Sequence, residues 1–314
     1  MTKQLPGERL EDVIQRDAYT GGLFVNEPMK DHTTLRIGGS AEIYAEPKDT
    51  GSMKNLLSAL LEDDIASMPL GGGSNLLVSD EGIEGAVIST ASLDHMRVIE
   101  EDAYSARVFA EAGVPLGRLI NLSRDKGYRG VEGLTGIPGS LGGAILGNAG
   151  SFGFSIGDVV ESVTGMDRNG KTLHIKKDDI SFGYRASGIP EGVIVLSAEM
   201  RFQKDDIQNV IKRVSDFNRE KMTKHPIAQF SAGCVFKNPA GNHAGKLIDH
   251  SGCKGMSRGD IEVSDLHANY FINKGNGKAC DFLALMEDVR ERVMKSFGIE
   301  LEPEIKIVGR KDRG

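Results

Sequence analysis

Glycine constrains the fold of this chain more than any other residue type. There are 40 glycines among 314 residues, and there is no tryptophan. Because glycine lacks a Cβ atom, it allows tight turns and close approach of the backbone to a ligand. Three glycine-rich segments also carry hydrogen-bonding side chains: Gly71-Gly72-Gly73-Ser74-Asn75, Gly136-Ile137-Pro138-Gly139-Ser140-Leu141-Gly142-Gly143 and Asn148-Ala149-Gly150-Ser151-Phe152-Gly153.

Loops of this kind favour the binding of phosphate groups. Without Cβ atoms, consecutive backbone N–H groups can converge on phosphate oxygens, and Ser or Asn at the loop edges adds further donors. Each segment alone could be an ordinary turn, but three in one chain favour a dinucleotide that lies along the loops. None opens a helix with the order Gly-x-Gly-x-x-Gly inside a βαβ unit, so a Rossmann cofactor site is disfavoured.

Residues 165–172 match the pattern of a phosphate loop. Their sequence, Gly165-Met166-Asp167-Arg168-Asn169-Gly170-Lys171-Thr172, would on pattern alone indicate a nucleotide hydrolase. That motif requires a strand before it and a helix after it. Here residues 171–175 continue as an alternating strand, and residues 167–170 have the composition of a hairpin turn. We therefore predict a β-hairpin and keep nucleotide hydrolysis as a weak alternative.

The composition places the chain among soluble, cytoplasmic proteins. Its length suggests two or three domains. The net charge of −7 and the pI near 5.6 give no basic field for nucleic acid or an anionic membrane. Cys234, Cys253 and Cys280 form an odd set without short spacing, which is typical of a reducing compartment. Residues 1–16 lack the apolar core of a signal peptide, and no apolar run is long enough to span a membrane.

Histidine and cysteine do not form a recognisable metal site. His243, His250 and Cys253 lie near one another in the sequence, but no fourth ligand stands at a familiar spacing. We interpret these three residues as structural and predict no metal.

Apolar spacing predicts a mixture of helices and strands. Helices are indicated over residues 50–63, 207–217 and 282–297, the last closed by Gly298. Strands are indicated over residues 66–70, 86–89, 97–112, 159–166, 172–175, 193–202 and 305–308. The start of the chain has an α/β pattern and the middle an α+β pattern. The charged run Arg219-Glu220-Lys221 is the predicted crossing into a last unit.

Cys234 is the strongest candidate for a reactive side chain. It lies in the segment Ser231-Ala232-Gly233-Cys234-Val235-Phe236-Lys237-Asn238-Pro239, between a glycine turn and a basic, amide-bearing strand end. A thiol has an ordinary pKa of roughly 8.5, so it is mostly protonated at neutral pH and can act as an acid or a nucleophile. The alternative is that Cys234 has only a packing role, as a small buried apolar side chain.

Motifs in the same order along nearly the whole chain carry a resemblance to a known family. Together with the glycine-rich loops, the sequence closely resembles the UDP-N-acetylenolpyruvoylglucosamine reductases, the FAD enzymes of peptidoglycan precursor synthesis. The short link after Tyr184-Arg185 looks like the shorter, type II form. The other motifs are Thr33-Thr34-Leu35-Arg36-Ile37-Gly38-Gly39, Phe182-Gly183-Tyr184-Arg185, Ser231 to Pro239, Ala244-Gly245-Lys246-Leu247-Ile248, Val263-Ser264 with His267-Ala268-Asn269, and Leu301-Glu302-Pro303-Glu304.

The resemblance implies both a fold and a reaction. The fold is α+β: a two-subdomain FAD-binding fold of the vanillyl-alcohol oxidase type plus a C-terminal α+β substrate domain. The expected domains are FAD-binding subdomain 1 at residues 1–80, FAD-binding subdomain 2 at 81–218 and the substrate domain at 219–314. In the reaction, NADPH reduces bound FAD. The flavin N5 then passes hydride to the vinyl carbon of UDP-N-acetylglucosamine enolpyruvate and forms UDP-N-acetylmuramate.

The implied setting is cytoplasmic cell-wall biogenesis, with consequences for cell shape and cell division. The only implied partner is the small UDP-sugar substrate, without nucleic acid or membrane. The sequence does not settle the oligomeric state, and a monomer is the working expectation.

The resemblance also assigns site residues. Arg185 and Glu304 match the pair that stabilises an enolate-like intermediate, and Cys234 occupies the position of the proton donor. Tyr184, Lys237, Asn238, His267 and Asn269 are expected at the substrate. The expected FAD-binding residues are Arg36, Gly71, Gly72, Gly73, Ser74, Asn75, Leu76, Gly136, Ile137, Pro138, Gly139, Ser140, Gly142, Gly143, Asn148, Ala149 and Gly150.

Some points stay open at the level of sequence. A bare carboxylate would repel an enolate, so we predict a raised pKa for Glu304, and Glu302, expected two residues away on the same strand face, is its rival. The best-known family members have Ser at the position of Cys234 and Gln at that of His225. Another FAD oxidoreductase or oxidase of the same fold is the main alternative function.

Overall fold

The computed structural model describes residues 19–310 and divides them into two compact units. Unit 1 comprises the chain up to Val25, Ile43–Gly72 and Gly85–Glu220, and unit 2 comprises Asn26–Glu42, Gly73–Glu84 and the chain from Lys221. The predicted lack of a signal segment in residues 1–16 falls outside the described residues. The division into three domains at residues 80/81 and 218/219 stays a prediction.

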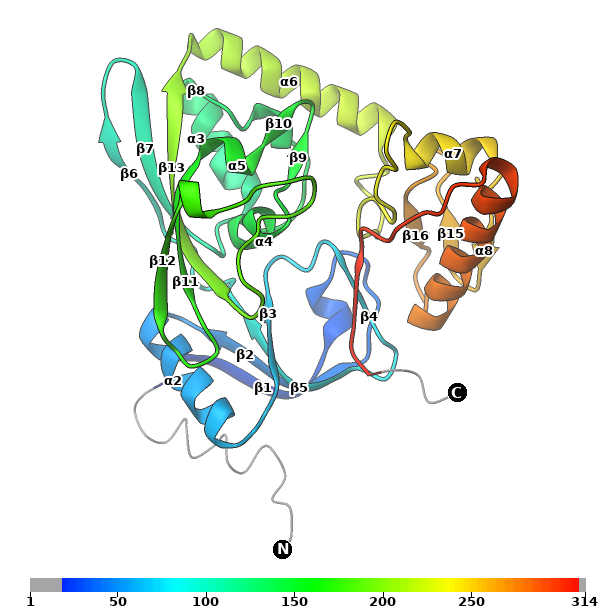
Figure 1. The fold of residues 1–314 in the computed structure, drawn as a ribbon, viewed down its shortest axis with the longest axis horizontal. Helices are drawn as coiled ribbons and strands as arrows, with labels where there is room; N and C mark the ends of the chain where they lie inside the picture. The colour runs from blue at the N-terminus through cyan, green and yellow to red at the C-terminus, as the bar shows by residue number, and fades with distance from the viewer. Residues whose placement is uncertain (1–18, 311–314) are drawn as a thin grey trace, which may run out of the picture. The chain divides into compact units, whose positions relative to one another are not determined.

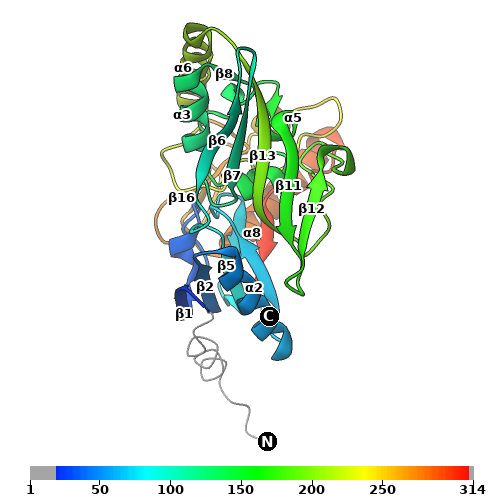
Figure 2. The ribbon, with the colours of Figure 1, turned by 90° about the vertical axis from the view of Figure 1, so that its left-hand side faces the viewer.

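The larger sheet of unit 1 is antiparallel. Its strands run in the order β12-β11-β13-β7-β6, with β8 beside β13, and Figure 2 shows the five long strands side by side. Their bounds are β6 Met96–Glu101, β7 Ser105–Glu111, β8 Tyr128–Arg129, β11 Val160–Met166, β12 Thr172–Lys176 and β13 Ile194–Lys204. Every second residue of β7 is buried, so one face of the sheet is covered and the other meets solvent.

Short helices cover the buried face of this sheet (Figure 1). They are α3 Leu116–Lys126, the 3₁₀ helix η2 Glu132–Leu134, α4 Leu141–Leu146 and α5 Ile156–Val159, and helix α6 Ile207–Lys224 follows β13. Helix α3 ends at Gly127, whose φ of 70° is a left-handed conformation that glycine adopts without strain. A two-stranded hairpin, β9 Gly150–Ser151 and β10 Phe154–Ser155, contacts η2.

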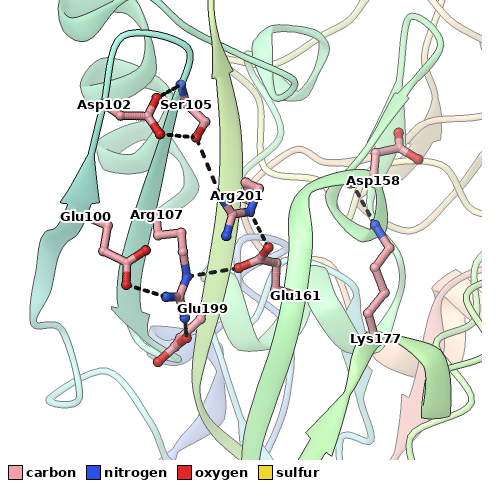
Figure 3. Close-up of polar contacts among 9 residues, drawn as sticks. All are labelled: Glu100, Asp102, Ser105, Arg107, Asp158, Glu161, Lys177, Glu199 and Arg201. Carbon is pink, nitrogen blue, oxygen red and sulfur yellow. Dashed lines mark hydrogen bonds and ion pairs between the residues drawn. The ribbon is translucent and has the colours of Figure 1, made fainter.

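The open face of the sheet carries an ion-pair cluster, drawn in Figure 3. Arg107 on β7 donates to Glu100 at 2.6 Å, to Glu161 at 3.1 Å and to Glu199 at 2.5 Å. Arg201 on β13 donates to the other oxygen of Glu161. These charges keep an otherwise uncovered sheet face polar.

A second sheet has the order β1-β2-β5-β3, with β1 Gly21–Pro28, β2 Ser40–Pro47, β5 Ile83–Ser89 and β3 Ser67–Leu70. Helix α2, Thr50–Glu62, buries Met53, Leu56, Leu57 and Leu60 in the same core cluster as residues of these strands. Asp49 caps its first turn, because one carboxylate oxygen accepts from Ser52 N at 2.7 Å.

Unit 2 has its own core and its own small sheets. Strands β14 Ser257–Arg258, β15 Ile261–Val263 and β16 Phe271–Asn273 form an antiparallel sheet, and β17 Lys306–Val308 pairs in parallel with β4 Leu76–Val78. The helical elements are η1 Met29–His32, α7 Ala244–His250 and α8 Ala279–Phe297. Buried residues of α7, α8, β15 and the segment 232–236 form one apolar cluster.

The expected elements are present with differences at their ends, except that the single strand predicted over residues 97–112 is a hairpin of β6 and β7, because Asp102 accepts from Tyr104 N and Ser105 N in a turn between them. The predicted helices correspond to α2, α6 and α8, and Gly298 ends α8 with φ of 65°. Residues 160–176 form the expected hairpin, in which Met166 pairs with Thr172, so no helix follows the phosphate-loop pattern. Glu302 and Glu304 precede β17 rather than lying on it, so their assignment to one strand face was wrong. Between residues 19 and 310, no helix is long and apolar enough to span a bilayer.

Candidate functional site

Two glycine-rich loops of unit 1 approach each other closely. A Cβ atom built on Gly72 would lie 2.6 Å from Gly139 Cα, and one built on Gly71 would lie 2.6 Å from Ser140 Oγ. Side chains at these positions would therefore force the loops apart. The two segments predicted to bind phosphate are thus neighbours in this unit.

The buried hydroxyl of Ser140 indicates a ligand-binding site between these loops. It is buried and has no hydrogen-bond partner among the described residues, although buried polar atoms are almost always paired. A phosphate oxygen would accept from it. In contrast, the N–H groups of Leu141 and Gly142 already donate to Val114 O and Ala112 O, both at 2.8 Å. We therefore propose that these two loops, called the diphosphate cradle below, would bind the diphosphate of FAD through Ser140 rather than through the N–H groups of Leu141 and Gly142.

The third loop supports the turn that carries Arg185. Asn148 Nδ2 donates to Gly183 O at 2.9 Å, and its Oδ1 accepts from Gly157 N at 3.1 Å. Arg185 Nη1 donates to Gly150 O at 3.2 Å, and the guanidinium carbon lies 5.4 Å from the Tyr184 ring centroid. Arg185 has a φ of 56°, which is strained for a residue with a Cβ. The loop thus holds a strained arginine in place.

In unit 2, Asn269 fixes the backbone next to Cys234. Its Oδ1 accepts from Phe236 N at 3.0 Å, and its Nδ2 donates to Phe236 O at 2.8 Å. Val235 N donates to Asn269 O at 2.9 Å, and Cys234 itself forms a β-bridge with Tyr270. The side chain of Asn269 is buried and its amide is occupied by this backbone. In this geometry the side chain of Asn269 positions the Cys234 segment, and its contact with substrate stays a prediction.

Glu304 lies on the other side of the same segment. Its N–H donates to Val235 O at 2.7 Å, and its carbonyl accepts from Asn75 Nδ2 at 3.1 Å. The rival Glu302 has a side chain that is 75% exposed and lies 3.4 Å from Lys237 Nζ. Both glutamates bond through their backbone to residues 235–237, but the Glu304 residue is half-buried whereas Glu302 is exposed. Burial therefore favours Glu304 as the carboxylate that accompanies Cys234, an assignment that stays a prediction.

A strained loop around Arg36 is bound to the same part of unit 2. Arg36 has a φ of 57°, and Asn273 Nδ2 donates to Leu35 O at 3.0 Å and to Arg36 O at 3.3 Å. Thr34 Oγ1 donates to Ser231 O at 2.7 Å. The sequence did not single out Asn273, because its partners are more than 230 positions away along the chain.

His225, where the family usually has Gln, joins an aromatic cluster. Its ring stacks on His267 at 4.7 Å between centroids and lies 5.4 Å from Tyr270. Burial lowers the pKa of His267, so its imidazole is mostly neutral at neutral pH. The stack gives the substituted residue a packing role beside the loop that contains Asn269.

The site residues divide between the two units. Unit 1 holds Arg185, Tyr184, Gly71, Gly72, Ile137, Pro138, Gly143, Ala149 and the other predicted residues of positions 136–150, whereas unit 2 holds Cys234, Glu304, Arg36, Gly73, Ser74, Asn75, Leu76, Lys237, Asn238, His267 and Asn269. Asn238 Oδ1 accepts from Ala244 N at 3.0 Å at the start of α7. Within residues 19–310, no three His, Cys, Asp or Glu side chains cluster as metal ligands would.

Comparison with known proteins matches both halves of this arrangement. A family described as FAD binding domain matches residues 41–176, and one described as UDP-N-acetylenolpyruvoylglucosamine reductase, C-terminal domain, matches residues 225–308. The chain is similar to proteins named UDP-N-acetylenolpyruvoylglucosamine reductase from Caldanaerobacter subterraneus subsp. tengcongensis, with 39% identity over 97% of this chain and 99% of that protein, and from Agathobacter rectalis, with 39% identity over 92% and 94%.

A solved structure extends the similarity to the fold. UDP-N-acetylenolpyruvylglucosamine reductase from Thermus caldophilus superimposes with a TM-score of 0.77 at 30% identity, covering 92% of this chain and 99% of that one. These matches confirm the predicted α+β, FAD-binding fold with an additional C-terminal domain. Since the similarity spans almost the whole length of each relative, the chain belongs to the UDP-N-acetylenolpyruvoylglucosamine reductase family.

Proposed function

We propose that this chain catalyses the NADPH-dependent, FAD-mediated reduction of UDP-N-acetylglucosamine enolpyruvate to UDP-N-acetylmuramate in peptidoglycan precursor synthesis. The observation that carries the proposal is the backbone hydrogen bond from Glu304 N to Val235 O at 2.7 Å, directly beside Cys234 in the sequence. This places a potential proton donor and a carboxyl group on adjacent backbone segments, in a chain that also has a cradle for a diphosphate. Cytoplasmic location and a monomeric state belong to the same proposal.

Among the expected cofactor residues, those of the two neighbouring loops are the ones we assign to the diphosphate. Ser140 offers the diphosphate a buried hydroxyl without a partner among the described residues, and the glycines at positions 71, 72 and 139 let the two loops pack closely beside it. When bound, FAD supplies the two-electron carrier between NADPH and the substrate.

The reaction builds negative charge on the substrate carboxylate, because hydride addition to the vinyl carbon gives an enolate-like intermediate. Arg185 can hold that carboxylate with two parallel hydrogen bonds, a geometry that Lys cannot reproduce. Cys234 then gives its proton to the neighbouring carbon. Glu304 assists as a protonated acid or by orienting other donors, since an ionised carboxylate would repel the developing charge.

The reaction is tested by following the reduction of the flavin by NADPH and its reoxidation by the UDP-sugar separately. The purified protein is reduced with NADPH in the absence of oxygen, while the visible flavin absorption is followed. We expect bleaching, and then recovery of the absorption when the enolpyruvyl UDP-sugar is added. Flavin that stays reduced after this addition would contradict the proposal, and formation of peroxide in air without any need for the UDP-sugar would support an oxidase instead.

A further inference from the structure

Glu132 is a fully buried carboxylate that the proposed chemistry does not use. It lies in η2 of unit 1 with an exposed side-chain fraction of 0%, compared with 33% for its partner Arg213 on α6. An ionised group is expensive to bury unless its oxygens are all paired. The hydrogen bonds of this carboxylate therefore indicate which parts of the fold it stabilises.

Both oxygens of Glu132 are hydrogen-bonded. Oε2 accepts from Gly130 N at 2.6 Å, and Oε1 accepts from Arg213 Nε at 2.9 Å and lies 2.8 Å from Arg213 Nη2. The same Nη2 donates to Asp205 Oδ2 at 2.7 Å. One side chain thus ties η2 to the backbone before it and to helix α6.

The backbone of η2 leads directly into the diphosphate cradle. The carbonyl of Glu132 accepts from Thr135 Oγ1 at 2.6 Å and from Thr135 N at 3.2 Å. Ile137 N donates to Leu134 O at 3.0 Å. Gly139 and Ser140, which follow in the same segment, are the part of the loop that reaches Gly72. Any displacement of Glu132 is therefore passed to the cradle within a few residues.

The same turn also supports the loop that holds Arg185. A Cβ atom on Gly133 would overlap Ser151 O and the Phe154 ring, so η2 packs tightly under the β9–β10 hairpin. Gly150 in that hairpin accepts from Arg185 Nη1 at 3.2 Å. Two of the three predicted cofactor loops, residues 136–143 and 148–153, are thus adjacent to η2, one through the chain and one through packing.

We infer that Glu132, paired with Arg213, is a positioning residue for the FAD site: it fixes the turn on which the Gly136–Gly143 loop and the Asn148–Gly150 loop both rest. The inference deepens the proposed function and rests on FAD being the cofactor. It adds residues that no loop motif would identify, because the pairing joins positions 81 apart in the sequence.

The test compares FAD affinity with thermal stability in three variants of the full-length chain. Glu132→Gln keeps an acceptor for Gly130 N but loses the charge pairing. Val210→Ala removes buried side-chain volume from the same helix without changing any hydrogen bond of Glu132 and serves as the control for stability alone. Glu132→Leu combined with Arg213→Met removes both charges, a change that often leaves stability intact.

The dissociation constant of FAD is measured by titrating the apoproteins at a temperature where all of them are folded. We expect Glu132→Gln and the double variant to weaken FAD binding by about tenfold, which corresponds to about 1.4 kcal/mol. Val210→Ala should lower the melting temperature and change FAD affinity by less than about threefold. The double variant should recover much of the stability lost in Glu132→Gln but not the FAD affinity.

Two results would overturn the inference: wild-type FAD affinity in Glu132→Gln, or FAD affinity that follows melting temperature through all three variants. FAD binding is measured without the UDP-sugar, so a wild-type protein that binds FAD but fails to reduce that substrate would refute the proposed function alone. A wild-type protein that binds no FAD would refute both.

Discussion

Two polar clusters, one in each unit, are stabilised in opposite ways. In unit 1, Arg107 joins three carboxylates on an open sheet face, where every partner is partly exposed. In unit 2, Asn269 and Asn273 are buried, carry no charge and bond to backbone atoms. Exposed ion pairs contribute little because water competes for the charges. A buried amide costs more to remove, because its loss leaves backbone groups without partners. We therefore expect the free energy of unfolding to fall more when a buried amide is removed than when an exposed cation is removed.

The largest effect should come from the residue that the amides position. Cys234→Ala removes the proposed proton donor, and we expect reoxidation of the reduced flavin by the enolpyruvyl UDP-sugar to slow by about 10²- to 10⁴-fold. Bleaching by NADPH should continue, as followed by stopped-flow absorption. Cys234→Ser is the matched control and should remain active, since it keeps a proton donor. Full turnover by the alanine variant would remove Cys234 from the mechanism.

The next effect concerns the amide itself. Asn269→Leu has a similar volume but leaves the N–H and C=O of Phe236 unpaired, and we expect a loss of about 3 kcal/mol in the free energy of unfolding. Urea denaturation measures it, with the exposed Asn242→Ala as control. A loss no larger than that of the control would mean that buried amides and exposed charges are equivalent here.

The ion-pair cluster should be worth less. Arg107→Met removes one cation and leaves Glu100, Glu161 and Glu199 to repel one another, so we expect a small loss in the free energy of unfolding at low salt, smaller than that of Asn269→Leu. The loss should shrink in 1 M NaCl, where the screening length falls to about 3 Å. Unfolding at two salt concentrations checks this, and a salt-independent loss would indicate packing by the arginine stem instead.

The smallest effect is a pH dependence at Asp49. Hydrogen bonds, first of all from the backbone N–H of Ser52 and then from Thr20, lower the pKa of this helix-capping carboxyl. Its stabilising contribution is therefore complete above the ordinary Asp pKa of about 3.9 and is lost as the pH falls through the lowered value. Asp49→Asn should flatten the acid limb of the stability curve by about 0.5 kcal/mol. An unchanged slope in urea titrations between pH 2 and 5 would rule out this contribution.

Local patterns in the sequence were sufficient for the parts of the fold that depend on neighbouring residues. The apolar spacing of Leu56, Leu57 and Leu60 predicts α2, and Gly298 predicts the end of α8, because both effects act within a few residues. The hairpin at residues 160–176 follows from turn composition in the same way.

Tertiary contacts account for what the sequence could not provide. Asn273 and Glu132 are ordinary polar residues until the fold brings Leu35 and Arg213 to them. The family resemblance supplied Glu304, but only burial in the folded chain separates it from Glu302, because both bond through their backbone to residues 235–237. The substrate contacts expected of Lys237, Asn238 and His267 stay predictions. No sequence pattern distinguishes a side chain that contacts a ligand from one that contacts the backbone, as Asn269 does.

The positive φ angles of Arg36 and Arg185 have a consequence for protein engineering. A search for stabilising substitutions would propose glycine at both positions, because relief of left-handed strain is typically worth about 1 kcal/mol or more. Each such change would remove a guanidinium group that the resemblance assigns to the site. Thermostability and turnover would therefore select for different residues at these two positions, and a library scored on melting temperature alone would drift towards a stable but inactive flavoprotein.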